Sequence, residues 1–258
     1  MVVMPPCPYP AIIFDLDDTL IAEESVARRS LVQAAQLVRG QDPEQVADVA
    51  RATARRIWRE APDHAVALEL GISSWEALWS SFEGGHPLLD GLRNWSRDYA
   101  SGVWRATLAH FGAGDHNLAD RLDAEYRRAQ RDASRTFAGV LELLGRLRRD
   151  GVRLGLLTNG PHDIQRHKLG HAGLADIFDA VAISGEVGVG KPDRIAFDQV
   201  RRALGVNEPL LMVGDSWDRD VGGGLSAGWS AVWVSHGRPL PKVHPRVTMV
   251  ENVVELGR

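Results

Sequence analysis

Short apolar runs alternate with longer helix-like patterns along much of the chain. Residues 11–16 form an apolar run that ends at a group of carboxylates. Four similar runs follow later in the chain, at residues 152–157, 180–183, 210–213 and 231–234. Short apolar runs bounded by polar residues or glycine are typical of buried strands. Because helix-length segments separate the later runs, we predict an α/β fold, a Rossmann-like parallel sheet with helices on both faces.

A different pattern occupies residues 23–135, which contain no convincing strand. Ser25 predicts the cap of a helix that begins at Val26, and Pro43 predicts the first turn of another helix. Most of the tryptophans fall in this stretch: Trp58, Trp75, Trp79, Trp95 and Trp104. We expect them to form the core of a helical bundle; the alternative is that one or two of them line a ligand cleft.

This change of pattern predicts two structural units. We expect residues 1–22 and 136–258 to form an α/β catalytic core. We expect residues 23–135 to form an all-helical cap domain, inserted after the first strand. A chain of 258 residues is long enough for two units of modest size.

Composition and charge narrow the functional classes. The formal net charge of −4 gives no overall attraction to a nucleic acid polymer or a membrane surface. The apolar runs are far shorter than the roughly 20 residues that a membrane helix needs. A single cysteine forms no internal disulfide, so nothing requires an oxidising compartment and we expect a cytoplasmic protein.

Polar residues gather at the ends of the predicted strands or just beyond them: Asp15 and Asp17, Thr158 and Asn159, Lys191, and Asp215 and Asp220. The carboxyl ends of parallel strands meet at one edge of a sheet, where ligands bind. A cluster of ionised carboxylates is costly to bury without a partner, so its presence at a strand end favours a function. We therefore expect these side chains to form one site.

The residue types at this edge fit phosphoryl chemistry. The carboxylate of Asp15 is able to attack phosphorus and form an aspartyl-phosphate intermediate. Asp17, two residues further on, is placed to protonate the leaving oxygen and then to deprotonate water. Thr158 and Asn159 are expected to hold phosphoryl oxygens, and Lys191 to neutralise charge on the nucleophile and the phosphoryl group.

A hard cation fits the same edge of the predicted sheet. Asp215 and Asp220, together with Asp15, offer the oxygen ligands that Mg²⁺ prefers. The cation is needed because an anionic nucleophile must approach an anionic phosphoryl group. We therefore predict Mg²⁺ as the cofactor and a small-molecule phosphoester as the substrate.

At this point the sequence resembles the haloacid dehalogenase superfamily, in its phosphatase branch. The resemblance rests on four segments in matching order and spacing, residues 15–19, 158–160, 191–192 and 214–220. It implies Asp15 as the nucleophile and Asp17 as the acid/base. It also implies that Mg²⁺ is held by Asp15, the main-chain carbonyl of Asp17 and Asp215, with Asp220 acting directly or through water. The helical insertion resembles the cap of that family.

Within the superfamily, residues 158–229 look most like acylneuraminate-9-phosphate phosphatases and a group of pyrimidine 5′-nucleotidases. The resemblance implies a phosphosugar, a sialic acid phosphate or a nucleoside monophosphate as the substrate, in a monomer or a homodimer. The cap is expected to determine substrate specificity. Its polar and aromatic residues near predicted loops are the specificity candidates: His64, Trp79, His86 and Arg93.

Other functions fit parts of the sequence. A phosphomutase on the same core, or a catalytically silent binding or regulatory protein, remains an alternative. Dehalogenation is disfavoured by Asp17. A departing halide needs no proton, so a dehalogenase has no use for an acid/base at this position. Residues 185–191 match most of a nucleotide-binding P-loop, but the following position is Pro192, which lacks the hydroxyl that meets Mg²⁺.

Overall fold

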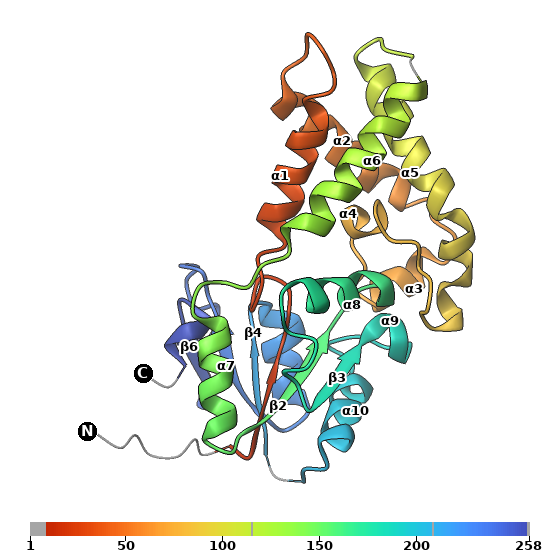
Figure 1. Cartoon of the computed structure of the whole chain (residues 1–258). Coiled ribbons are helices and arrows are strands. Elements are labelled where there is room, and N and C mark those ends of the chain that lie inside the picture. The colour runs from red at the N-terminus through yellow and green to blue at the C-terminus, as the bar shows by residue number, and fades with distance from the viewer. Residues whose placement is uncertain (1–8, 115, 208, 257–258) are drawn as a thin grey trace.

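The structure is a computed structural model that describes residues 9–114, 116–207 and 209–256. Residues 1–8 and 257–258 of the predicted core therefore lie outside the described residues. The described chain divides visibly into a sheet with its flanking helices and a group of helices that stands beyond one edge of that sheet (Figure 1). The boundaries of the two predicted units stay a prediction.

Six parallel strands form a single sheet in the order β3-β2-β1-β4-β5-β6. Their bounds are β1 Ala11–Phe14, β2 Arg153–Thr158, β3 Ala180–Ile183, β4 Leu211–Gly214, β5 Ser230–Val234 and β6 Val247–Val250. β1 pairs with β2 on one side and with β4 on the other, so the strand that carries Asp15 at its end is central. The predicted Rossmann-like α/β sheet is confirmed.

The sixth strand, β6, differs from the prediction of five strands. It pairs with β5 at the edge of the sheet, from Ala231–Val247 to Val234–Val250. Its central residues Thr248 and Met249 are exposed, so the strand lacks the continuous apolar run that marks its neighbours. An edge strand needs less apolar surface than a buried one, which explains why the hydrophobic pattern missed it.

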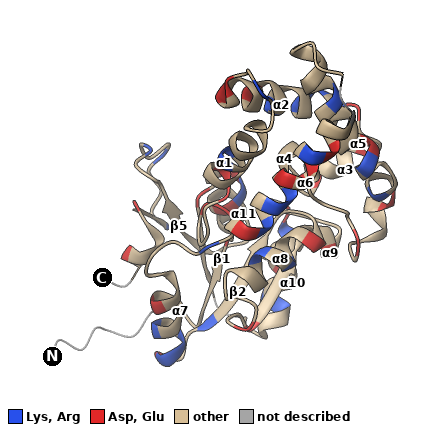
Figure 2. Cartoon of the chain, turned by 45° about the horizontal axis from the view of Figure 1, so that its top comes forward, with Lys and Arg blue, Asp and Glu red and all other residues tan. Residues whose placement is uncertain are grey.

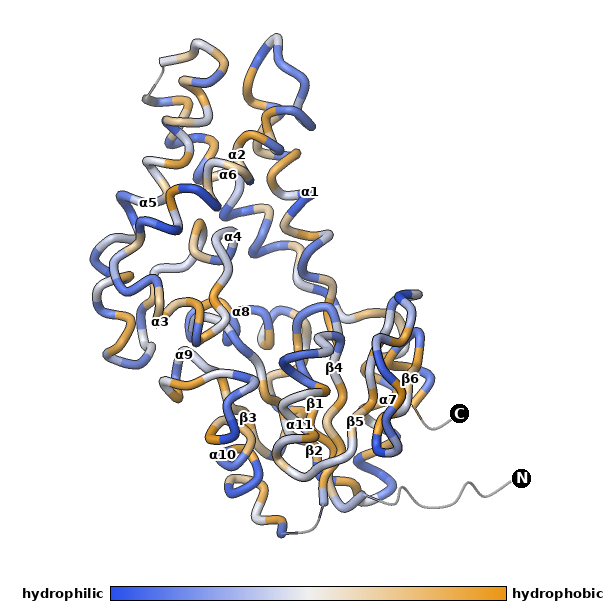
Figure 3. Tube along the Cα trace, turned by 180° about the vertical axis from the view of Figure 1, so that it is seen from behind, coloured by the Kyte–Doolittle hydropathy of each residue, from blue (hydrophilic) through white to orange (hydrophobic). Residues whose placement is uncertain are grey.

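Helices cover both faces of the sheet because successive strand residues point to opposite sides. Ile12 and Phe14 of β1 pack with α7 (Val140–Arg149) and α8 (His162–His171), whereas Ile13 packs with α10 (Arg194–Leu204). Figure 3 shows hydrophobic residues concentrated along these central strands. Each fully buried aliphatic or aromatic side chain contributes about 1.5–3 kcal/mol to stability. This packing fixes the strand ends on which the polar residues lie.

The segment between β1 and α7 is helical, as expected. Its α-helices are α1 Glu24–Ala35, α2 Pro43–Trp58, α3 His64–Glu69, α4 Ser74–Ala77, α5 Asp90–His110 and α6 His116–Ala133, with a short 3₁₀ turn at Pro87–Leu89. Trp58, Trp79 and Trp104 are buried in their common core, and Trp95 packs against it. Lys, Arg, Asp and Glu are mixed along α6 rather than separated by sign (Figure 2).

Helix starts show where local sequence signals succeed and fail. The Asp42 side chain accepts a hydrogen bond from the Glu44 amide at 3.1 Å, so α2 begins at Pro43 as predicted. The predicted Ser25 cap is wrong, because α1 already begins at Glu24. The carboxylate of Asp18 accepts from the Glu23 and Glu24 amides instead, at 2.9 and 3.2 Å.

Later helices differ in detail from the sequence pattern. Pro192, in the predicted helical connection before β4, lies outside the helix: α10 begins at Arg194, with Asp193 as its N-cap. The helix expected after β4 is a π-helical turn, Trp217–Gly222, followed by the short α11 (Gly223–Ser226). Two further short helical turns are α9 (Ser184–Val187) and the 3₁₀ turn Val253–Glu255. None of the helices in the described chain combines the length and apolar character needed to cross a membrane.

Two neighbouring segments connect the helices to the sheet. Ile21 forms an antiparallel bridge with Thr136. The Phe137 amide donates to the Leu20 carbonyl at 2.9 Å. The chain therefore leaves β1 and returns toward α7 along one hydrogen-bonded pair of segments.

Candidate active site

A cavity of about 450 Å³ lies over the carboxyl end of β1. Its volume falls in the range of about 300–1,000 Å³ that is typical of small-molecule sites. The strand ends and the loops that follow them contribute Asp15, Asp17, Asn159, Lys191, Asp215 and Asp220 to its lining. The helical segment contributes a second group, Arg55, Trp58, Arg59, His64 and Trp75.

Asp15, Lys191 and Asp220 form a buried ion-pair group at one end of this cavity. The Lys191 ammonium lies 2.5 Å from Oδ1 of Asp15 and 2.7 Å from Oδ1 of Asp220. Thr19 donates its hydroxyl to Oδ2 of Asp15 at 3.3 Å. These contacts fix the Asp15 carboxylate at the end of β1.

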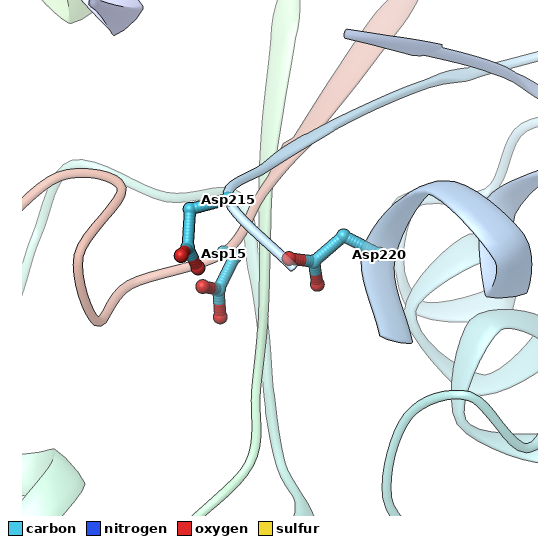
Figure 4. Close-up of side chains that lie close together, drawn as sticks. All are labelled: Asp15, Asp215 and Asp220. Atoms are coloured by element: carbon cyan, nitrogen blue, oxygen red, sulfur yellow. The ribbon is translucent and has the colours of Figure 1, made fainter. Parts of the chain in front are cut away.

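The carboxylates of Asp15, Asp215 and Asp220 converge (Figure 4), with a ligand oxygen from each within 4.8 Å of the others. Burial raises the pKa of Asp15 well above its usual value; Lys191 opposes this shift, and Asp220 and Asp215 add to it. Burial, then Asp220 and Asp18, raise the pKa of Asp215 to about 6. A divalent cation would offset both the burial of these carboxylates and their mutual repulsion, so the residues present fit Mg²⁺.

Gly214 makes this close approach possible. A Cβ at this position would lie 2.3 Å from the carboxylate carbon of Asp220, so any side chain would displace that carboxylate. Oδ2 of Asp220 also accepts a hydrogen bond from the Ser216 amide at 2.9 Å. The loop after β4 is thereby folded back against its own strand end.

Asp17 is held by two side chains of α8. The Lys168 ammonium lies 2.9 Å from its Oδ1, and the Gln165 amide donates to its Oδ2 at 2.8 Å. Gln165 also donates to the Thr158 hydroxyl at 2.6 Å. The predicted acid/base thus has both carboxylate oxygens oriented by the core.

Lys168 lies within residues 158–229, which carry the resemblance to the phosphatases, but the sequence did not reveal its partners. It is fully buried and also contacts Glu23 and Glu76 at 3.1 and 3.2 Å. Burial alone would lower the pKa of Lys168, but the three carboxylates outweigh it and raise the pKa. Burial raises the pKa of Glu23 to about 8 in spite of Lys168.

Glu76 had a readable signal in the sequence. Ser73 and Glu76 form a capping box at the start of α4, in the Ser-x-x-Glu spacing that marks such boxes. The same carboxylate contacts Lys168 through its other oxygen. Glu76 therefore links the helical segment to Asp17 through Lys168.

Asn159 and Thr158 differ in their access to the cavity. Asn159 lines it and also brackets the main chain of Lys191, accepting from its amide at 2.8 Å and donating to its carbonyl at 2.9 Å. Thr158 is fully buried and is not among the lining residues. Phosphate binding by these two residues stays a prediction.

Comparison with known proteins decides the family. A family model described as haloacid dehalogenase-like hydrolase matches residues 9–228. The chain belongs to the haloacid dehalogenase-like hydrolase family. This confirms the predicted superfamily, and the matched range contains Asp15, Lys191 and Asp215.

Relatives within the haloacid dehalogenase-like hydrolases are phosphatases. A phosphoserine phosphatase of Thermus thermophilus is 38% identical over 227 residues, covering 88% of each chain. An N-acylneuraminate-9-phosphatase of Homo sapiens is 28% identical over 257 residues, covering 95% of this chain and 91% of the relative. The predicted phosphatase branch and the prediction of a phosphoric monoester hydrolase are confirmed.

A solved structure shares the fold over nearly the whole length. A putative hydrolase of the same family from Bacillus subtilis, crystallised with magnesium, aligns with a TM-score of 0.64 and 21% identity over 96% of both chains. At this identity the likeness shows the haloacid dehalogenase-like fold alone.

The four specificity candidates are placed differently in this hydrolase. His64 lines the cavity, whereas the other three are not among its lining residues. Trp79 packs edge-on against His167, the His86 ring accepts from the Leu88 amide, and Arg93 pairs with Asp90. Among the tryptophans, Trp58 and Trp75 line the cavity, and Trp58 also belongs to the helical core.

Proposed function

We propose that the chain is a Mg²⁺-dependent phosphatase that hydrolyses a small phosphorylated metabolite through an aspartyl-phosphate intermediate. The observation that carries this proposal is the buried Asp15 carboxylate, 2.5 Å from Lys191 and beside Asp215 and Asp220. It combines a fixed nucleophile, a cation and a convergent carboxylate group in one cavity.

In the first step, Asp15 attacks phosphorus while the bond from phosphorus to the ester oxygen breaks. Asp17 gives its proton to that departing oxygen. In the second step, Asp17 takes a proton from water, whose oxygen attacks phosphorus and releases Asp15 and inorganic phosphate. Lys168 and Gln165 keep the Asp17 carboxylate in one orientation through both steps.

Asp15, the Asp17 carbonyl, Asp215 and Asp220 are the groups that would hold Mg²⁺. A bound Mg²⁺ supplies charge neutralisation between the anionic nucleophile and the phosphoryl group. Lys191, already paired with two of these carboxylates, contributes a fixed positive charge on the same side.

The proposed substrates are a phosphosugar, a sialic acid phosphate, a nucleoside monophosphate or another small phosphoester of the kinds named for the relatives. The proposal includes a cytoplasmic location, because the single cysteine needs no oxidising compartment. It also includes a monomeric or homodimeric state.

The test is release of inorganic phosphate from p-nitrophenyl phosphate by the full chain with Mg²⁺. Asp15→Asn removes the nucleophile and is expected to lower turnover by about 10³-fold or more. Asp193→Asn is the matched control, since asparagine replaces aspartate well at the N-cap of α10 and turnover stays within about twofold. Near-normal turnover of the Asp15 variant would refute the aspartyl-phosphate route. Absence of phosphate release from any phosphoester would favour a silent binding protein.

A further inference from the structure

Aromatic side chains on the helical wall of the active-site cavity carry ring nitrogens that are unpaired within the described chain. Trp58, His64 and Trp75 line the cavity, and each has a buried ring nitrogen, Nε1 or Nδ1, without a hydrogen-bond partner among the described residues. Trp58 is only 4% exposed. A buried polar group without a partner destabilises the fold, so a hydrogen bond to a ligand would stabilise these ring nitrogens.

Two arginines add positive charge to the same wall. Arg55 and Arg59, one helical turn apart at the end of α2, both line the cavity. Neither forms an ion pair within the described part of the chain, whereas Arg51 and Arg56 of the same helix pair with Glu24 and Glu60. The free guanidinium groups of α2 are therefore the ones that face the cavity.

Acidic residues of the cavity do not account for these arginines. Glu23 and Glu76 direct their carboxylates at Lys168. Asp15 and Asp220 are paired with Lys191, and Asp215 is paired with Arg238. The sheet side thus has its own cations, and the positive charge of the helical wall is left for a ligand.

We infer that the substrate carries a second anionic, acceptor-rich group, bound by Arg55 and Arg59 with the ring nitrogens of Trp58, His64 and Trp75. This inference rests on the proposed phosphatase function and narrows its substrate class. A carboxylate matches the planar donor pair of arginine, and a second phosphate shares the same chemistry. The phosphoryl group that reacts lies at Asp15 and the second anion lies at the end of α2.

The experiment compares substrates that differ in this second group alone. Phosphoserine is paired with phosphoethanolamine, which lacks the carboxylate, and 3-phosphoglycerate with glycerol 3-phosphate. Fructose 1,6-bisphosphate is paired with fructose 6-phosphate to represent a second phosphate. We expect kcat/KM to favour the doubly anionic member of at least one pair by about tenfold or more, which one charge-assisted hydrogen bond supplies.

Variants locate the source of that preference. The Arg55→Gln/Arg59→Gln double variant is expected to reduce the tenfold ratio to about one or two, mainly through KM. Arg56→Gln, on the same helix but outside the cavity lining, keeps the ratio. A preference in the carboxylate pairs identifies a carboxylate, and a preference in the bisphosphate pair alone identifies a second phosphate.

Two results overturn the inference while leaving the phosphatase proposal intact. One is hydrolysis of p-nitrophenyl phosphate with no preference in any pair. The other is a preference that the double variant retains. Failure to hydrolyse every compound, p-nitrophenyl phosphate included, overturns the phosphatase proposal itself and this inference with it.

Discussion

Replacing Lys168 by methionine is expected to destabilise the fold by about 3–5 kcal/mol at pH 7, the cost of breaking a buried ion pair from one side. Lys168 is fully buried, and its ammonium contacts Asp17, Glu23 and Glu76 at 2.9, 3.1 and 3.2 Å. Methionine keeps an unbranched side chain of similar length and removes only the charge and the donors. The loss therefore reports on the three carboxylates rather than on packing.

The carboxylates do not share this loss equally. The pKa of Glu23 is raised to about 8, so this group is largely neutral at pH 7 and loses little when the cation is removed. Asp17 and Glu76 bear most of the cost. Without Lys168, ionised carboxylates at these two positions have no cation to offset their burial, whereas their protonated forms avoid that cost. The variant is then least destabilised at low pH and loses stability as the pH rises.

Urea unfolding at pH 5 and pH 7 measures this effect. The unfolding is monitored by both tryptophan fluorescence and circular dichroism, because coincident transitions verify two-state behaviour. Lys242→Met is the matched control: Lys242 is exposed, and its replacement is expected to change the free energy of unfolding by at most about 0.5 kcal/mol. A loss below about 1 kcal/mol at pH 7 would refute the reasoning. So would a larger loss at pH 5 than at pH 7.

Three further predictions concern the metal, the pH dependence and the core. Removal of divalent cations with EDTA is expected to abolish phosphate release, and added Mg²⁺ to restore it; full activity in EDTA would contradict the Mg²⁺ assignment. Glu23→Gln removes a carboxyl that, between about pH 4.5 and 8, is protonated in the folded state and ionised in the unfolded state. The stability of the variant relative to the native chain should therefore rise with pH across this range, by up to about 1.4 kcal/mol per pH unit, as measured by urea unfolding. A flat or falling difference would speak against the raised pKa. Leu144→Ala in α7 should cost about 2–5 kcal/mol by the same measurement, because Leu144 is fully buried against the sheet, whereas exposed Leu141→Ala should cost far less.

The catalytic edge of the sheet was predictable because its signals are local. Asp15 and Asp215 each follow an apolar run, and the order of the strands brings such ends together without knowledge of any contact. The same logic predicted the central strands from their continuous apolar residues. It failed for β6, whose half-exposed residues give no such run.

Contacts between distant side chains were beyond the reach of the sequence. Lys168 lies 151 positions from Asp17 and 92 from Glu76, and no spacing rule links them. Arg55 and Arg59 are equally compatible with a solvated helix face until the fold places the end of α2 over the cavity. Of the four cap candidates, His64 alone is among the cavity-lining residues of the described chain. A position near a predicted loop therefore does not show whether a polar side chain faces the cavity.

The hydrogen-bonded pair of segments at Leu20–Ile21 and Thr136–Phe137 has a consequence for how the chain folds and diverges. β1 must find β2 across the whole helical segment, and the entropy of closing a loop grows only with the logarithm of its length. Because α1 and α6 pack side by side, the folded segment delivers its two ends to neighbouring positions and acts as a short tether. The sheet therefore tolerates gain, loss or exchange of this segment at little cost in chain entropy. Substrate specificity can then diverge through the helical segment while the polar strand ends stay unchanged.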